Sequence, residues 1–168
     1  MSLVVPVQFA CLMGFALLLV AAAWQDLRTM RIADAFSLAI VAAFGVWALS
    51  GLAAGNISIS KIALAVGCAA AVFAIGALAF VFGALGGGDV KLLAAASIFA
   101  GPALLPDFLM ITALAGGVLG LAMLVGARIG PAAPAGDGSI SARLRGGLPY
   151  GPAIAAGGLW VAAALAAS

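Results

Sequence analysis

Long apolar runs separated by short polar connections make up most of the sequence. A helix that crosses a bilayer needs about 20 mainly apolar residues. Six runs of approximately this kind are expected to form helices: residues 5–25, 35–54, 61–84, 90–105, 107–127 and 149–167. The connections contain charges, glycine or proline, which is typical of chain that leaves the membrane. The pattern predicts an all-α integral membrane protein, a polytopic bundle of about six transmembrane helices.

The fourth run is too short to cross a bilayer on its own. It contains 16 residues, 90–105, and is interrupted by Gly101 and Pro102. If its far end reaches the outer surface, its first residues lie below the cytoplasmic surface. Irregular backbone such as "LGGGD" is tolerated at that depth only where protein buries it or where it lines a wet cavity. We therefore expect Asp89 at a helix N-terminus, on the floor of a pocket that opens to the cytoplasm.

Composition narrows the chemistry that the chain can perform. Of its 168 residues, 67% are hydrophobic and 7% charged, which excludes an ordinary soluble domain. The chain has no histidine, and its five acidic residues are all aspartates, so an enzyme mechanism has to use carboxylates, lysine, tyrosine, hydroxyls or thiols. Cys11 and Cys68 lie in apolar runs without a nearby partner. We expect them to be small buried hydrophobes and expect no metal site.

Basic residues predict the orientation of the chain. With six spans the connections alternate between two sides, and only Lys61 falls on the side opposite to the other basic residues. Positive charge stays in the cytoplasm, so the basic side is expected inside and both termini outside. The basic side carries Arg28, Arg31, Lys91, Arg128, Arg143 and Arg145. Residues 128–147, rich in glycine, proline, alanine and serine, are expected to be a flexible cytoplasmic loop of one membrane-embedded domain, residues 1–168.

Two aspartates meet on this basic side. Asp26 ends the first run and Asp89 begins the fourth, so the alternation of spans puts both at the cytoplasmic end. Two carboxylates close together in a low-dielectric site do not both ionise easily, so one holds a proton. The charged one can take a proton from a water molecule that attacks a carbonyl group, while the protonated one polarises the carbonyl oxygen. Taken singly, Asp89 could instead cap its helix beside Lys91, and Asp26 could pair with Arg28.

The other aspartates have simpler interpretations. Asp34 lies eight residues after Asp26, so it shares a face with Asp26 on a continuous helix and is otherwise the N-cap of the second span. Asp107 is expected to start a helix on the outer side, and Asp137 to be solvated in the loop. The three glycines at 86–88 are expected to allow close approach of an extended peptide.

Three motifs resemble the prepilin peptidase family and occur in the family's order. "GGGDVKLLAA", residues 86–95, is similar to the Gly-x-Gly-Asp signature of intramembrane aspartyl proteases, with the extension typical of prepilin peptidases. "DLRTMRIAD", residues 26–34, resembles the first catalytic segment of that family. "LPYGPAIAAG", residues 148–157, resembles the closing motif of its short Flp/Tad-type members. The resemblance covers essentially the whole chain.

This resemblance implies an aspartic endopeptidase that removes the short, positively charged leader from type IV prepilins or pseudopilins. The reaction is expected at the cytoplasmic face of the bacterial inner membrane, with the family's two catalytic aspartates at Asp26 and Asp89. The apolar helix of the substrate is expected to dock laterally, among membrane lipid. No metal, organic cofactor or nucleic acid is expected. Four residues are expected to contact the substrate: Gly86, Gly88, Lys91 and Tyr150.

Two departures from the family pattern bear on the function. Longer members have a cytoplasmic domain with Cys-x-x-Cys motifs and methylate the new N-terminus, but this chain has only two, well separated cysteines, so no methyltransferase activity is expected. Ala33 and Asp34 stand where Pro-Asn is usual, which leaves open whether Asp34 contributes to the carboxylate pair. Pro149 and Tyr150 either shape the pocket or simply begin the last helix.

A transporter or channel is the main alternative function, because intramembrane carboxylates and broken helices also build ion and proton sites. Against this alternative, both proposed aspartates lie near one face, and no charged residue lies at the middle of a long span. A third interpretation is a noncatalytic assembly factor whose arginines bind anionic lipid. An assembly factor tolerates replacement of both aspartates, and a proton transporter produces flux in liposomes, whereas a protease does neither.

Overall fold

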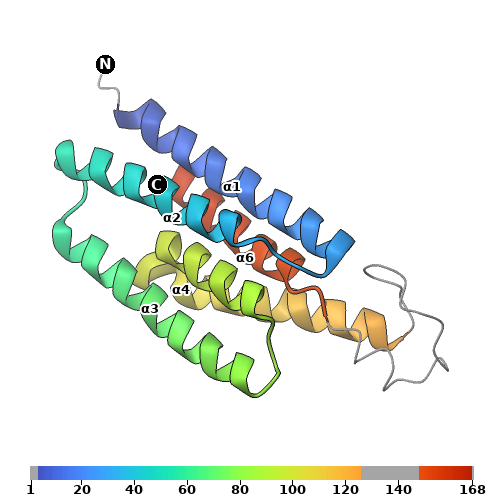
Figure 1. Ribbon diagram of the computed structural model, residues 1–168. Coiled ribbons are helices and arrows are strands. Elements are labelled where there is room, and N and C mark those ends of the chain that lie inside the picture. Colours follow the sequence, from blue (N-terminus) through green and yellow to red (C-terminus); the bar gives the residue numbers. More distant parts are fainter. Residues whose placement is uncertain (1–3, 126–147, 168) are drawn as a thin grey trace.

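Five helices make up most of the part of the chain that the structure describes, a computed structural model with residues 4–125 and 148–167 (Figure 1). The helices are α1 Val4–Thr29, α2 Asp34–Ala53, α3 Ile59–Val81, α4 Gly87–Leu124 and α6 Gly151–Ala166. Four of them are long and apolar enough to cross a membrane, and α6 is a shorter apolar helix. The predicted all-α polytopic bundle is confirmed. The loop expected at 128–147 lies outside the described residues.

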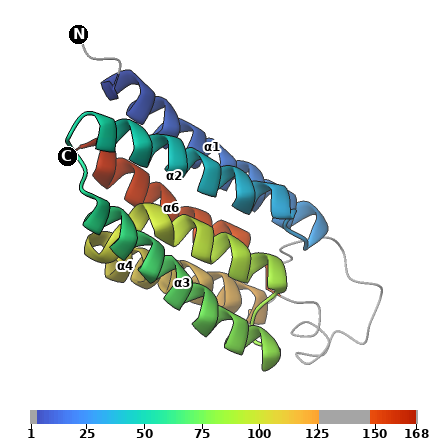
Figure 2. The same cartoon turned by 60° about the vertical axis from the view of Figure 1, so that its left-hand side comes forward.

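Helix α4 breaks sharply at Gly101, where the backbone has φ 54° and ψ −171°. After this residue the chain turns back, and the second half of α4 runs beside the first (Figures 1 and 2). The sequence predicted the boundary near residue 106. It lies at Gly101 because glycine adopts positive φ without steric strain, and Pro102 suits the first position of a helix, which needs no N–H donor. The first half, Gly87–Ala100, has 14 residues and is about 21 Å long, so the short fourth segment is confirmed.

The conformation of Gly101 leads to a prediction about stability. A residue with a Cβ atom at this combination of φ and ψ is strained by about 1–3 kcal/mol. We expect Gly101→Ala to lower the thermal unfolding temperature of the purified protein in detergent, whereas the control Gly67→Ala should not lower it. Gly67 suits this purpose because a Cβ added there meets no atom within 4 Å. Equal unfolding temperatures for the two variants would show that the turn does not depend on glycine.

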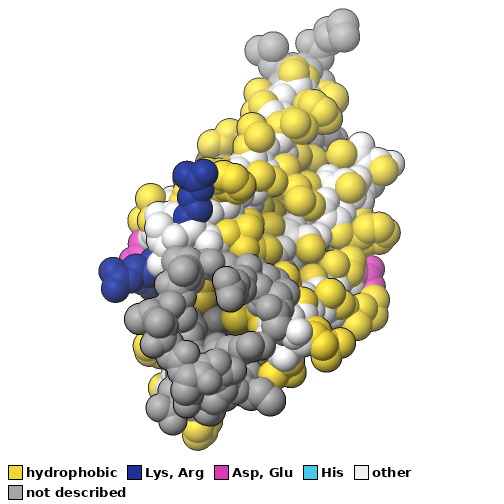
Figure 3. Space-filling model, turned by 90° about the vertical axis from the view of Figure 1, so that its right-hand side faces the viewer, with side chains coloured by type: hydrophobic (Ala, Val, Ile, Leu, Met, Phe, Trp, Pro, Cys, Tyr) yellow, Lys and Arg dark blue, Asp and Glu magenta, His cyan; other side chains and the backbone are white. Residues whose placement is uncertain are grey.

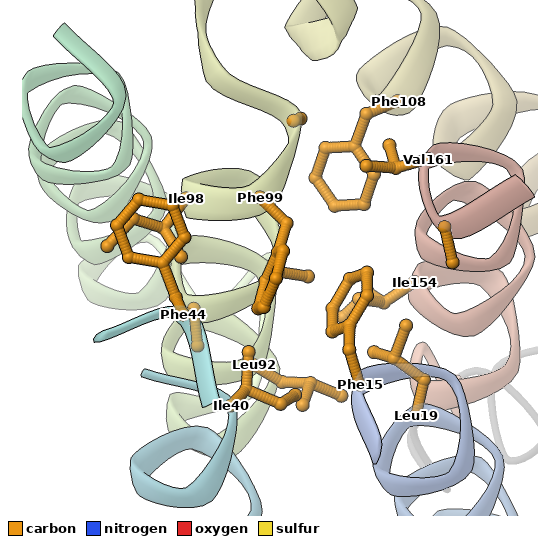
Figure 4. Packing of buried hydrophobic residues seen from close by; sticks show 14 of the residues in the cluster. Phe15, Leu19, Ile40, Phe44, Leu92, Ile98, Phe99, Phe108, Ile154 and Val161 are labelled. Atoms are coloured by element: carbon orange, nitrogen blue, oxygen red, sulfur yellow. The ribbon is translucent and has the colours of Figure 1, made fainter. Parts of the chain in front are cut away.

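Aromatic side chains form the centre of the bundle, between α1, α2, α4 and α6 (Figure 4). The rings of Phe15 and Phe99 stack with centroids 4.3 Å apart, and Phe44 meets Phe99 edge-on at 5.3 Å. Phe108, from the second half of α4, is fully buried nearby. Helix α3 adds little to this centre and packs mainly on α4. Apolar side chains cover most of the outside of the bundle, as expected for a surface that faces lipid (Figure 3).

One end of the bundle gathers the end of α1 and the beginnings of α2, α4 and α6, whereas the N-terminus of α1 and the C-terminus of α6 lie at the other end (Figures 1 and 2). We call the first of these the site end. Arg28, Arg31 and Lys91 lie there, and Lys61 lies near the start of α3 at the opposite end. Figure 3 looks onto the site end and shows basic side chains at its edge. The described basic residues are therefore distributed between the two ends as the sequence predicted.

Candidate active site

Asp26 is a buried carboxylate near the end of α1. Its side chain is only 4% exposed. Its Oδ2 atom accepts a hydrogen bond of 2.8 Å from the backbone N–H of Gly151, the first residue of α6. The N–H groups of the first helical turn have no partner within the helix and carry partial positive charge, so they favour a carboxylate at this position. The alternative contact with Arg28 is not formed, because the Arg28 guanidinium lies over the Trp24 ring, 4.4 Å from its centroid.

Gly151, which donates to the Asp26 carboxylate, was not predicted as a site residue from the sequence. A Cβ atom at this position would lie 2.8 Å from Cβ of Asp26 and 2.9 Å from its Oδ2 atom, closer than neighbouring side chains tolerate. The local signal was present in Gly151-Pro152, because proline in the first turn marks a helix start and so exposes N–H donors. The sequence did not indicate which acidic group those donors would meet, since Asp26 lies 125 residues away.

Asp89 lies in the first turn of α4 and is half-buried. Its Oδ2 atom accepts a hydrogen bond of 3.2 Å from the backbone N–H of Gly86, the residue that caps this helix. The carboxylate therefore caps its own helix, as one interpretation of the sequence had it, and it also interacts electrostatically with Asp26. The two aspartates, from α1 and α4, thus lie at the same end of the bundle, near enough to repel each other electrostatically.

The glycines before Asp89 pack closely against the protein itself. A Cβ atom at Gly88 would lie 3.1 Å from the carbonyl oxygen of Ile32, in the connection between α1 and α2. At Gly86 it would lie 2.7 Å from Oδ2 of Asp89. The missing side chains therefore allow this connection and the Asp89 carboxylate to approach the start of α4. The connection is itself held by a hydrogen bond of 3.2 Å from the Ala33 N–H to the Gln25 side chain.

Asp34 pairs with Lys91 and not with the other aspartates. The Lys91 ammonium donates to Oδ1 and Oδ2 of Asp34 at 2.8 and 2.7 Å. Helix α1 ends at Thr29, so Asp34 and Asp26 do not share a helix, and the N-cap of α2 is Ala33. Both predicted placements of Asp34 are therefore wrong. The first helix ends five residues before Asp34, and the second begins one residue earlier in its capping than predicted, with Ala33 as the N-cap. Lys91, expected to contact the substrate, has a partner within the protein.

Tyr150 precedes the first residue of α6 and packs against the second half of α4. A Cβ atom at Gly116 would lie 3.3 Å from the Tyr150 ring, and one at Gly120 would lie 3.9 Å from Leu148. Gly116 and Gly120, a spacing that favours close helix packing, thus face the segment before α6 in the same chain. Pro149 is fully buried. This packing fixes the start of α6, and with it the N–H that Asp26 accepts.

No cluster of three or more His, Cys, Asp or Glu side chains that could hold a metal ion occurs within residues 4–125 and 148–167. Cys11 and Cys68 are free, partly buried thiols on different helices.

Comparison with known protein families agrees with the resemblance of the motifs. A model of the type IV leader peptidase family matches residues 13–121, which is more than half of the chain. The match includes Asp26 and Asp89 and ends before Gly151. Comparisons with curated proteins and with solved structures give no match. The chain belongs to the type IV leader peptidase family.

Proposed function

We propose that this leader peptidase is a membrane aspartic endopeptidase that removes the leader from Flp-type prepilins, with Asp26 and Asp89 as its catalytic residues. The observation that carries the proposal is that these two carboxylates lie at the site end of the bundle, near enough to repel each other electrostatically. In both residues Oδ2 accepts a backbone N–H. Oδ1 of each accepts no hydrogen bond from the described residues, which leaves it available to water or to a peptide group.

The proposed reaction uses the pair as one acid and one base. The charged carboxylate takes a proton from water as the water oxygen attacks the carbonyl carbon of the scissile peptide bond. The protonated carboxyl group donates its proton to the carbonyl oxygen, so a tetrahedral diol forms without a free oxyanion. The carbon–nitrogen bond then breaks as the first carboxyl group gives its proton to the leaving nitrogen, while the second carboxylate takes a proton from a diol hydroxyl, which restores the starting pair. The backbone N–H groups of Gly86 and Gly151 keep the two carboxylates in place throughout.

The site end is proposed to face the cytoplasm of a bacterial cell, with the protein in the inner membrane. The support is charge, because Arg28, Arg31 and Lys91 lie at this end and positive residues are retained inside. The Trp24 side chain, stacked under Arg28 and 58% exposed, suits the boundary between lipid and water. The substrate then carries its leader in the cytoplasm and its apolar helix in the bilayer, beside the bundle.

The reaction product is a direct test of the proposal. We expect the purified protein, incubated with a Flp-type prepilin in detergent, to make one cut after the leader glycine and to leave an unmethylated N-terminus. The closing motif "LPYGPAIAAG" supports the Flp-type substrate, and the two separated cysteines offer no paired motif of the methylating members. Intact-mass analysis of the pilin, with S-adenosylmethionine present and absent, measures both features.

Other products would contradict specific parts of the proposal. A pilin heavier by one methyl group only when S-adenosylmethionine is present would show methyltransferase activity. No cut in Flp-type prepilins, together with a correct cut in other type IV prepilins, would reject the proposed substrate class and keep the peptidase. No cut in any prepilin, with proton flux into liposomes, would support the transporter alternative.

A further inference from the structure

A groove opens on the outside of the bundle between α2 and α3. These helices are joined at the far end and separate toward the site end, and the first half of α4 lies behind the gap (Figures 1 and 2). The groove has a volume of about 360 Å³. Its lining residues come from all three helices: Asp34, Ser37, Leu38, Val41, Ala69, Phe73, Lys91, Ala94, Ala95 and Ile98. It lies on the side of α4 away from Asp89, because residues two apart on a helix point in nearly opposite directions.

The groove is charged at one end and apolar along the rest of its length. Asp34 and Lys91 lie at the site end and are bound to each other, with 62% and 47% of their side chains exposed. All the lining residues beyond them except Ser37 are apolar. A ligand that matches this pattern has a charged head and an apolar body. In a protein whose outer surface is apolar, a membrane lipid has this combination of a charged head and an apolar body.

Ser37 adds a polar contact one helical turn below the charged end. Its side chain is 8% exposed, and its hydroxyl group has no hydrogen-bond partner among the described residues. It follows Asp34 by three residues, which is about 4.5 Å along the helix axis. A buried hydroxyl without a partner is unfavourable, so an acceptor oxygen at this depth would be stabilising. The ester oxygens of a phospholipid lie at this depth, between the phosphate and the acyl chains.

The groove is too small to enclose a turn of protein helix. A helix with its side chains has a diameter of about 10–12 Å and a pitch of 5.4 Å, so each turn occupies about 500 Å³. The groove, at about 360 Å³, holds less than one such turn. An acyl chain is much thinner and can follow the apolar residues from Leu38 toward Ile98.

We propose that this groove binds one phospholipid whose headgroup contains a primary ammonium and a phosphate, with the phosphate on Lys91, the ammonium on Asp34 and an acyl chain between α2 and α3. When this headgroup binds, Lys91 exchanges Asp34 for the phosphate, and Asp34 exchanges Lys91 for the ammonium. Each protein charge therefore keeps a partner of opposite sign. An anionic lipid without an amine would put its phosphate beside Asp34 with nothing to compensate. A choline headgroup has no N–H to donate to the carboxylate.

Retention of lipid by the purified full-length protein tests the proposal independently of peptidase activity. We expect native mass spectrometry in detergent to show one bound phosphatidylethanolamine, and this lipid to raise the unfolding temperature more than phosphatidylcholine or phosphatidylglycerol does. Ala69→Leu extends a side chain into the groove. By displacing about two methylene groups of the acyl chain, it should lower the affinity for phosphatidylethanolamine about tenfold. The matched control Ala70→Leu, on the exposed neighbouring position outside the groove, should bind as the wild type does.

A second variant guards against damage to α3. Val41→Phe narrows the groove from α2 and should lower the affinity for phosphatidylethanolamine in the same way. The unfolding temperature of both variants, measured without added lipid, shows whether each is folded. Equal affinity of the wild type for the three lipids would overturn the proposal. A folded groove variant that binds phosphatidylethanolamine as tightly as the wild type does would also overturn it. So would a groove variant that raises KM for prepilin and leaves lipid binding unchanged, because the groove would then hold the substrate helix.

Discussion

Asp26→Asn and Asp89→Asn are each expected to abolish leader removal, with a loss of rate of about 10³-fold or more. Asparagine has the shape of aspartate and can still accept the N–H of Gly151 or Gly86, so the local structure is retained. An amide cannot take a proton from water, and it cannot supply one to the carbonyl oxygen. Each substitution is therefore expected to remove half of the proposed acid–base pair and to leave the bundle intact.

The measurement is the conversion of prepilin to pilin on a gel after co-expression, corrected for the amount of each variant in the membrane. Asp107→Asn is the matched control, because Asp107 lies beyond the Gly101 turn, in the second half of α4. Asp34→Asn should also retain cleavage, since exposed ion pairs such as Asp34–Lys91 contribute only about 0–1 kcal/mol. Normal processing by either Asp26→Asn or Asp89→Asn would remove that residue from the mechanism.

Gly151→Ala is expected to lower kcat about 10²-fold while changing KM less. The added methyl group would meet the Asp26 side chain at 2.8 Å, so either α6 or the carboxylate has to move. A displacement of about 1 Å at a catalytic group costs about that factor. Substrate binding away from the two carboxylates is not touched by this change.

The control for this prediction is Gly117→Ala, because a Cβ atom at Gly117 meets nothing within 4 Å. Steady-state kinetics with purified prepilin give kcat and KM, and thermal unfolding shows whether each variant is folded. A folded Gly151→Ala enzyme with the kcat of the wild type would mean that the contact between Gly151 and Asp26 does not position the carboxylate for the reaction.

The fold was predictable from the sequence because each apolar segment can be recognised from its own residues, and the side on which each connection lies follows from counting these segments. The short fourth helix follows from the distance between the three glycines and Gly101-Pro102, and the shared end of Asp26 and Asp89 follows from counting spans. The turn in α4 was predicted about five residues too far along the chain, because Pro106 also resembled a boundary. In the structure Pro106 lies within the second half of α4.

The contacts of the site were less predictable because they join distant parts of the chain. Asp34 and Lys91 are 57 residues apart, and either could have had a different partner. Gly151 donates through a backbone N–H, a group that every residue except proline has, so the sequence does not indicate this contact. Only the packing of α6 beside α1 determines which carboxylate it meets.

The bond between Gly151 and Asp26 also has a consequence for biosynthesis. It joins the first helix of the bundle to α6, the helix that the ribosome makes after all the other described ones. Until α6 has entered the membrane and packed beside α1, the Asp26 carboxylate lacks the donor that holds it. If Asp26 is catalytic as proposed, we expect a nascent chain without α6 to be inactive, and cleavage of prepilin to begin only once α6 is in place beside α1.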